Sequence, residues 1–198
     1  MIIYGDSKSG NCYKLQLVCA NLGLKYTWVE LNILNKETQN ADFLAKNPNG
    51  KIPIIELESG EVITESNAIL NYLADNTELL PAEPLKRARV LQWQFFEQYS
   101  HEPYIAVARF IEKYLNLPTE RLAEYKQKQE GGYKALDIME SHLADNLFLV
   151  ANKYSIADIS LYAYTHVAHE GGFDLTSYPH IQLWLNRIEQ HPGYCAMQ

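Results

Sequence analysis

Two side chains suited to nucleophilic chemistry follow the first predicted strand, a hydroxyl at Ser9 and a thiol at Cys12, with the carboxamide of Asn11 between them. A helix is expected to begin between Gly10 and Cys12, so the thiol lies in its first turn. The dipole at a helix N-terminus stabilises negative charge and lowers the pKa of a cysteine, which is about 8.5 in a free thiol. The segment could therefore stabilise a reactive thiolate.

A second pair of residues, Glu65 and Ser66, opens another predicted helix. Unpaired N–H groups and the helix dipole at such a position favour a bound carboxylate. The same residue types also suit ordinary helix capping. Both interpretations can hold together, because a ligand carboxylate would satisfy the same unpaired N–H groups.

The first part of the chain alternates strand and helix patterns, which predicts an α/β layer. Apolar side chains at Leu15, Val18, Cys19 and Leu22 follow helical spacing, and Gly23 suits the end of that helix. A strand, this helix and a second strand form a βαβ unit, whose strands should be parallel. The expected strands are 1–4, 26–31, 52–57 and 61–64, and the expected helices are 10–22, 41–46 and 66–75.

Only helical patterns follow a proline-containing linker at 76–84. The first expected helix is 85–114, with a break near Pro103, and the second is 119–146, with Thr119 as its cap and a bend at Gly131–Gly132. A Ser155–Asp158 capping box opens the third, 155–170. The last helix carries the apolar residues Ile181, Trp184, Leu185 and Ile188. We therefore expect an α/β domain at 1–77 and an all-helical domain at 84–198.

Composition narrows the class of protein. The formal net charge of -7 argues against a nucleic-acid partner, which would need a positive surface. No apolar stretch approaches the roughly 20 residues that span a bilayer, and the first residues lack the pattern of a signal peptide. Three sparse cysteines fit a reducing compartment. The sequence therefore predicts a soluble, cytoplasmic protein without a membrane partner.

No metal site is expected. The cysteines lack the spacing of zinc ligands, and His166 and His169 have no patterned carboxylate or further ligand near them in the sequence. We interpret these histidines as packing or surface residues. Asp158 is interpreted as a capping residue rather than a catalytic acid.

Two motifs, Asn47-Pro-x-Gly-Lys-x-Pro53 and Glu65-Ser66, stand about a dozen residues apart in this α/β context. In this order and spacing the chain resembles the cytosolic glutathione transferase family, in particular its bacterial, theta-like and phi-like members. The resemblance covers essentially the whole chain. It implies a thioredoxin-like α/β N-terminal domain, an all-α C-terminal helical bundle and a homodimer that conjugates glutathione to electrophilic small molecules.

The resemblance also implies how glutathione would be held. The Ile52–Pro53 bond would be cis, so that the backbone N–H and C=O of Ile52 pair with the cysteinyl backbone of glutathione. Ser66 would bind the γ-glutamyl carboxylate, and Glu65 would receive the adjacent ammonium group. Lys51 is assigned to the glutathione pocket as well, and Gln39, or alternatively Thr38, to the glycyl end of glutathione. The family often has a basic or bulky polar residue at that end, which this sequence lacks.

For catalysis the resemblance implies that Ser9 donates a hydrogen bond to the glutathione thiolate, with Asn11 and Cys12 nearby. Cys12 offers a rival mechanism, since some bacterial members form a mixed disulfide with glutathione. However, Cys12 shares a helix face with apolar residues, so it could instead be buried and inert. The residues favour Ser9. Tyr4 is a third candidate, because other classes use a tyrosine, but it falls inside the first strand.

The electrophile would lie against the first long helix of the second half, where Tyr104 and Arg109 are our candidates for binding it. The sequence does not identify the electrophile. Two alternatives remain open: a glutathione-dependent thiol, disulfide or peroxide reductase, and a non-catalytic binding or assembly module. A module of that kind would tend to lose Ser9 or the Glu65–Ser66 pair, and this chain retains them.

Overall fold

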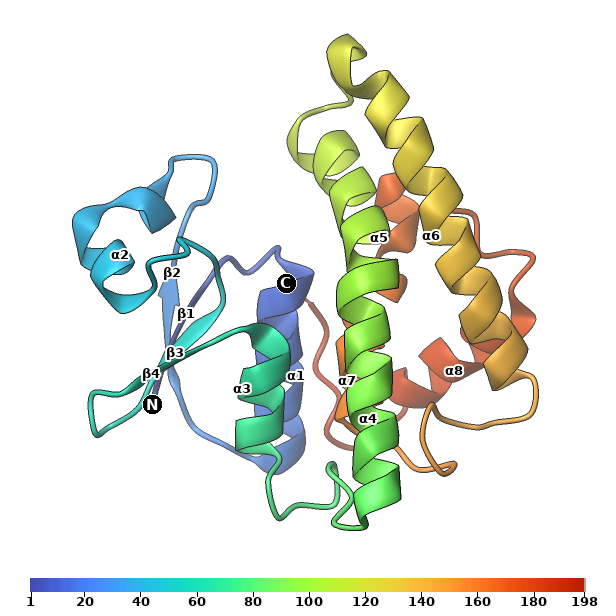
Figure 1. The fold of residues 1–198 in the computed structure, drawn as a ribbon, viewed down its shortest axis with the longest axis horizontal. Coiled ribbons are helices and arrows are strands. Elements are labelled where there is room, and N and C mark those ends of the chain that lie inside the picture. Colours follow the sequence, from blue (N-terminus) through green and yellow to red (C-terminus); the bar gives the residue numbers. More distant parts are fainter. Residues whose placement is uncertain (198) are drawn as a thin grey trace. The chain divides into compact units, whose positions relative to one another are not determined.

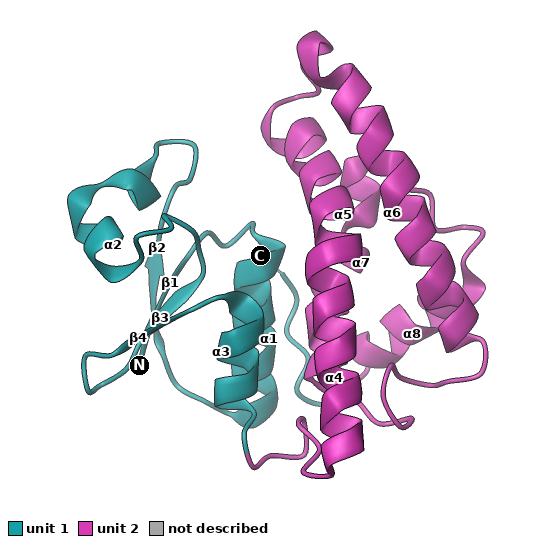
Figure 2. Ribbon diagram, viewed as in Figure 1, with its two compact units in different colours: residues 1–75, 192–198 teal, residues 76–191 magenta. Residues whose placement is uncertain are grey.

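A computed structural model describes residues 1–197 of the chain. They form two compact units, drawn in different colours in Figure 2. The first unit comprises residues 1–75 together with the C-terminal tail from Pro192, and the second comprises residues 76–191. The domains expected from the sequence, 1–77 and 84–198, assign the tail from Pro192 to the second domain, whereas in the structure it belongs to the first unit.

The first unit is an α/β layer with a four-stranded sheet of strand order β2-β1-β3-β4. Its elements are β1 (Ile2–Gly5), α1 (Gly10–Leu22), β2 (Thr27–Glu30), a short 3-10 turn (Glu37–Gln39), α2 (Ala41–Lys46), β3 (Ile54–Glu56), β4 (Val62–Thr64) and α3 (Ser66–Leu73). Strands β1 and β2 are parallel, as the βαβ pattern predicts, and β3 and β4 form the expected antiparallel hairpin.

Strand register determines which loops meet. Ile54, the first residue of β3, pairs with Tyr4 near the end of β1 and with Thr64, the last residue of β4. Since β3 runs antiparallel to both neighbours, the chain enters β3 at the same end of the sheet at which β1 and β4 leave it. The loop after β1, the segment before β3 and the start of α3 therefore gather at one end of this sheet.

Helices α1 and α3 pack side by side on one face of the sheet, and α2 lies on the other side (Figure 1). The predicted apolar stripe on α1 is buried, and Gly23 closes the helix in the left-handed conformation that favours glycine, with φ of 64°. Isoleucines of the central strands, Ile3, Ile54 and Ile55, complete this core. The tail packs on the same helix, where the Tyr13 hydroxyl donates a hydrogen bond of 2.6 Å to the carbonyl of Cys195.

The second unit is entirely helical. Its elements are α4 (Pro84–Phe96), a π-helical turn (Glu97–His101), α5 (Glu102–Arg109), a second π-helical turn (Phe110–Tyr114), a 3-10 turn (Thr119–Arg121), α6 (Leu122–Leu143), α7 (Ile156–Thr165), a 3-10 turn (Ala168–Gly171) and α8 (Pro179–Glu189). Helix α6 packs against α5 and α8, and α7 packs against α4. An α/β thioredoxin-like domain with an all-helical second domain is thereby confirmed.

Three details differ from the sequence-based expectation. Thr119 begins a 3-10 turn rather than capping α6, and α7 ends at Thr165 rather than near Glu170. Helix α6 continues unbroken through Gly131 and Gly132. Glycine at these positions allows neighbouring side chains to pack directly against the backbone of α6. A Cβ atom at Gly131, for example, would lie 2.1 Å from the Tyr104 ring.

The Ser155–Asp158 capping box forms as predicted and anchors the second unit. The buried carboxylate of Asp158 accepts hydrogen bonds from four donors: the Leu149 N–H, the Trp184 indole, and both the N–H and the hydroxyl of Ser155, at 2.9–3.0 Å. Burial raises the pKa of Asp158 to about 6, although these hydrogen bonds act to lower it. The role is structural, which confirms Asp158 as a capping residue.

None of the helices within residues 1–197 combines the length and the apolar character needed to cross a membrane.

Replacing Asp158 with alanine should lower the free energy of unfolding by about 3 kcal/mol, because it removes a helix cap and leaves the buried donors of Leu149 and Trp184 unpaired. Urea denaturation followed by circular dichroism measures the loss. The matched control is Asp174→Ala, since Asp174 is exposed and caps only a local turn through the Thr176 N–H; it should cost about 0.5 kcal/mol. Equal losses for both variants would contradict this account.

Candidate functional site

The three segments singled out in the sequence meet at one end of the sheet of the first unit. Besides the strand register, a hydrogen bond joins two of them directly: the Ser66 hydroxyl donates to Oδ1 of Asn11 at 3.3 Å. Asn11 belongs to the first turn of α1, and Ser66 is the first residue of α3. Two helix N-termini therefore point toward a shared polar region.

The loop that carries Ser9 is held by carboxylates. Glu30 at the end of β2 accepts from both the N–H and the hydroxyl of Ser7, each at 3.0 Å, and from the Trp28 indole at 2.5 Å. The Asp6 side chain accepts from the Lys8 N–H, and its carbonyl accepts from the Ser9 N–H. These contacts position Ser9 as the residue that precedes α1. Its half-buried side chain makes no capping hydrogen bond to that helix.

Cys12 lies in the first turn of α1 with no exposed surface. Burial raises the pKa of its thiol to about 12, and this outweighs the lowering effect of the Ser9 hydroxyl and of the backbone at Asp6. The sulfur is also enclosed by backbone, because a Cβ atom at Gly5 would lie 2.9 Å from it. Of the two interpretations of this cysteine, the structure favours the buried and inert one. The expectation that the helix dipole lowers its pKa is wrong, because desolvation dominates.

Glu65, immediately before α3, adopts a strained backbone conformation. Its φ of 66° and ψ of 113° lie outside the regions that residues with a Cβ atom ordinarily occupy. Its carboxylate is exposed and does not cap the helix. A strained backbone of this kind costs about 1–3 kcal/mol and is common at ligand-binding positions.

Ser66 itself is almost fully buried, and its oxygen has two neighbours. It donates to Asn11 and accepts from the ammonium group of Lys14 at 3.3 Å. Within residues 1–197, no acceptor pairs with the backbone N–H of Ser66, as is usual at a helix N-terminus. The start of α3 therefore offers an open backbone N–H to an anion.

The Ile52–Pro53 peptide bond is cis, as the resemblance implied. Neither the N–H nor the C=O of Ile52 has a hydrogen-bond partner in the described part of the chain. The preceding loop is closed by Asn47, whose carboxamide donates to the Lys51 carbonyl at 2.7 Å. A donor and an acceptor of the backbone are thus open beside the start of β3.

Two further predicted residues lie near this loop. The exposed Gln39 donates to the Gly50 carbonyl at 3.3 Å, and this contact requires glycine at position 50, where φ is 62° and a Cβ atom would lie 2.4 Å from the Gln39 amide. Lys51 is exposed. Their assignment to a ligand remains a prediction.

Tyr4 faces away from this chemistry. Its hydroxyl donates to Glu56 at 2.8 Å, and Glu56 also accepts from Lys46 at 2.6 Å. Burial is the largest effect that raises the pKa of Tyr4, and the hydrogen bond to Glu56 raises it further. A tyrosine held in this way is a poor candidate for stabilising a thiolate, which agrees with its position inside β1.

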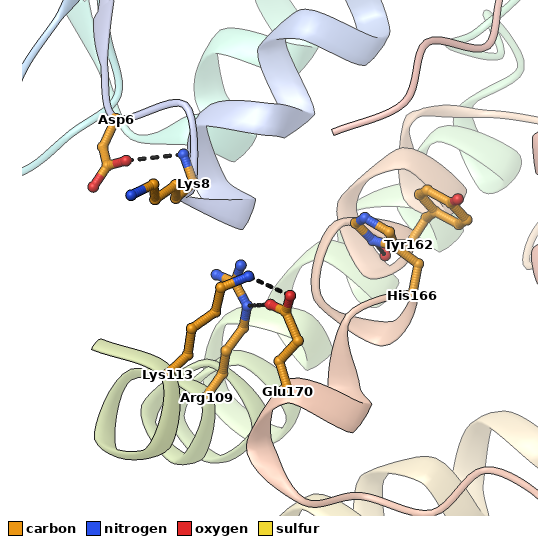
Figure 3. A network of polar contacts seen from close by, with 7 residues as sticks. All are labelled: Asp6, Lys8, Arg109, Lys113, Tyr162, His166 and Glu170. Atoms are coloured by element: carbon orange, nitrogen blue, oxygen red, sulfur yellow. Dashed lines mark hydrogen bonds and ion pairs between the residues drawn. The ribbon is translucent and has the colours of Figure 1, made fainter. Parts of the chain in front are cut away.

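The predicted acceptor-binding residues are both engaged within the helical unit. Tyr104 lies against α6, with the Lys128 ammonium 5.4 Å from its ring centre. Arg109 is buried and donates to Glu170 at 2.6 Å, and Lys113 bonds to the same carboxylate, as Figure 3 shows. Burial alone would raise the pKa of Glu170, but its bonds to Lys113 and Arg109 lower it. A role of Tyr104 and Arg109 in binding an electrophile remains a prediction.

His166 and His169 belong to no metal cluster, since no group of at least three potential ligands occurs within residues 1–197. His166 stacks on Tyr162 and bonds to its carbonyl at 2.8 Å. Burial lowers the pKa of His166 to about 4. It is a packing residue, as interpreted from the sequence.

Two residues of this site were missed in the sequence. Glu30 holds the Ser9 loop, but it ends a strand and carries no motif. Lys14 was detectable in principle, because it is the one charged residue in the predicted helix 10–22 and stands directly between Tyr13 and Leu15. A lysine is almost never fully buried without a polar partner.

Comparison with known proteins agrees with this geometry. Residues 1–75 match the glutathione S-transferase N-terminal domain model, and residues 93–192 match the glutathione S-transferase C-terminal domain model. A crystal structure of a glutathione S-transferase from Pseudomonas fluorescens Pf-5 is 60% identical, with a TM-score of 0.98 over 99% of this chain and 98% of that chain.

More distant relatives carry out different reactions. A maleylacetoacetate isomerase from Methylobacterium extorquens AM1, solved with bound malonate and GSH, is 25% identical with a TM-score of 0.82, covering 98% of this chain and 94% of that chain. A disulfide-bond oxidoreductase of Escherichia coli (strain K12) is 28% identical over 92% of this chain and 87% of its own length. Both domain models and the high structural similarity lead to one conclusion: the chain belongs to the glutathione S-transferase family.

Proposed function

We propose that this protein binds glutathione in the first unit and conjugates its thiolate to electrophilic small molecules. The observation that carries the proposal is the meeting of three segments at one end of the sheet: the Ser9 loop, the Ile52–Pro53 segment and the start of α3. A relative of known structure contains bound GSH, which supports glutathione as the ligand of this chain.

The open backbone groups of Ile52 would pair with the cysteinyl backbone of glutathione, as an added strand pairs with a sheet edge. The hydroxyl and N–H of Ser66 would bind the γ-glutamyl carboxylate at the start of α3, where the helix dipole favours negative charge. The exposed Glu65 carboxylate would receive the neighbouring ammonium group. Gln39 and Lys51, at the rim of the same loop, would face the remaining parts of the tripeptide.

Ser9 would donate its hydroxyl to the sulfur of bound glutathione and so stabilise the thiolate, with Asn11 beside it. A shift of two pKa units in the bound thiol corresponds to about 2.7 kcal/mol, which one charge-assisted hydrogen bond and a helix dipole can supply. The hydroxyl is suited to this role, because it does not cap its own helix. Tyr104 and Arg109 remain our candidates for the electrophile side, and we place the reaction in the cytoplasm.

Reduction of disulfides or peroxides is the second candidate, favoured by the similarity to a disulfide-bond oxidoreductase. A route through a mixed disulfide on Cys12 conflicts with the burial of that thiol and its pKa of about 12. A reductase reaction would therefore use a second glutathione rather than Cys12. A non-catalytic role is disfavoured by the retention of Ser9, Glu65 and Ser66.

Ser9→Ala should lower kcat/KM for glutathione conjugation to a chlorodinitrobenzene by about 100-fold at pH 6.5, since the thiolate loses about 2.7 kcal/mol of stabilisation. Its pH–rate profile should shift upward by about two units. The matched variant Cys12→Ala should retain activity within about threefold. Steady-state kinetics measures both, and the reverse pattern would move the chemistry to Cys12. Failure of the wild-type protein to bind immobilised glutathione would reject the proposal as a whole.

Glu65→Ala and Glu65→Gly should both weaken glutathione binding by about tenfold, because each removes the carboxylate that receives the ligand's ammonium group. They should differ in stability. Glycine adopts φ of 66° combined with ψ of 113° without strain, so the free energy of unfolding should be about 1 kcal/mol higher for the glycine variant than for the alanine variant. Calorimetric titration and urea denaturation measure the two effects. Unchanged binding in both variants would remove Glu65 from the site.

We further propose that the protein is a homodimer. Large apolar side chains are exposed on neighbouring helices of the second unit: Phe95 on α4, Tyr99 in the following π-helical turn and Ile138 on α6, at 61%, 75% and 52% exposure. Tyr99 and Ile138 line one hollow of about 370 Å³. An exposed apolar patch of this kind is typical of a protein interface.

Light scattering should give twice the chain mass for the wild-type protein, and Ile138→Asp should shift the population toward monomer by placing a charge in the interface. Leu183→Asp is the matched control, since Leu183 is equally exposed, at 57%, but lies on α8. A monomeric wild-type protein at micromolar concentration would refute the dimer.

A further inference from the structure

Lys14 is the one lysine within residues 1–197 that has no exposed surface. It lies in the second turn of α1, among buried apolar neighbours. Burying an ammonium group is costly unless hydrogen bonds or opposite charge compensate it, and the Ser66 hydroxyl is one of the groups that this ammonium contacts.

The contacts of Lys14 determine the orientation of the Ser66 hydroxyl. The ammonium group has only donors, so in its contact of 3.3 Å with Ser66 the serine oxygen must accept. The single O–H of Ser66 is then free to donate elsewhere, and it donates to Oδ1 of Asn11 at 3.3 Å. Lys14 therefore keeps Ser66 in the role of donor, which is the role that an incoming carboxylate needs.

We propose that Lys14 is the positioning residue for the γ-glutamyl carboxylate of glutathione, acting through Ser66. This inference rests on the proposed function. When the carboxylate binds, the Ser66 hydroxyl turns from Asn11 to the ligand while its oxygen continues to accept from Lys14. The ammonium group polarises this O–H and strengthens the bond that it donates.

The charge also acts directly. A charge-assisted hydrogen bond from the Ser66 hydroxyl to a carboxylate oxygen would be about 2.7 Å long. Because Lys14 Nζ lies 3.3 Å from the same hydroxyl oxygen, the carboxylate oxygen would lie within about 6 Å of Nζ. At that distance in a buried site, opposite charges attract appreciably. Lys14 thereby makes the pocket selective for ligands that carry an α-carboxylate at this end.

The experiment compares two proteins and three ligands by calorimetric titration. The proteins are wild type and Lys14→Gln. The ligands are glutathione, 4-aminobutyryl-cysteinyl-glycine, which lacks only the α-carboxylate, and glutaryl-cysteinyl-glycine, which lacks only the amino group. Lys14→Gln should weaken glutathione and the glutaryl analogue by about tenfold, or about 1.4 kcal/mol, and leave the aminobutyryl analogue within twofold.

Two control variants accompany the measurement. Lys14→Arg should restore most of the lost affinity, because it restores the charge, and Lys25→Met should bind all three ligands as wild type does, since Lys25 is an exposed lysine. Equal weakening of all three ligands by Lys14→Gln would show that Lys14 acts only through the fold, and unchanged glutathione binding would overturn the proposal.

If Lys14→Gln does not fold, NMR of the wild-type protein labelled with 15N at the lysine side chains decides. The Lys14 ammonium signal should shift on addition of glutathione and of the glutaryl analogue, but not of the aminobutyryl analogue; a shift that is the same for all three ligands would overturn the proposal. Absence of glutathione binding by wild type would instead reject the proposed function.

Discussion

The register of the sheet in the first unit is the constraint on which the site depends. Pairing of Ile54 with both Tyr4 and Thr64 brings the end of β1, the entry to β3 and the end of β4 together. A slip of one residue in either pairing would reverse the faces of a whole strand and expose the isoleucines of the core. The hydrophobic core that stabilises the sheet therefore also aligns the polar residues at its end.

Within that frame, burial separates the two candidate catalytic groups. Ser9 precedes α1 and remains half-buried, whereas Cys12, less than one turn further, points into the core and has no exposed surface. Desolvation of the thiol outweighs the favourable hydroxyl beside it. The same helix carries the buried Lys14, which shows that a polar group can be retained in this core where a hydrogen-bond partner, here Ser66, is in reach.

Glu65 and Glu30 show how the backbone and the loops support the site. Glu65 holds a strained conformation at the junction of β4 and α3, although a glycine would adopt it without strain. Glu30 ties the loop after β1 to the end of β2 through Ser7. Neither arrangement improves the core. Both lie at the end of the sheet that carries the candidate site.

From the sequence alone, hydrophobic periodicity and turn residues predicted nearly every strand and helix, because these patterns reflect local geometry: the βαβ unit, the hairpin and the Ser155–Asp158 box all form. The motif residues likewise predicted the cis bond before Pro53. Only tertiary structure decided the burial of Cys12, the contact of Lys14 with Ser66 and the packing role of Gly131. These depend on which residues distant in sequence come into contact, and desolvation and close packing cannot be determined from spacing along one helix.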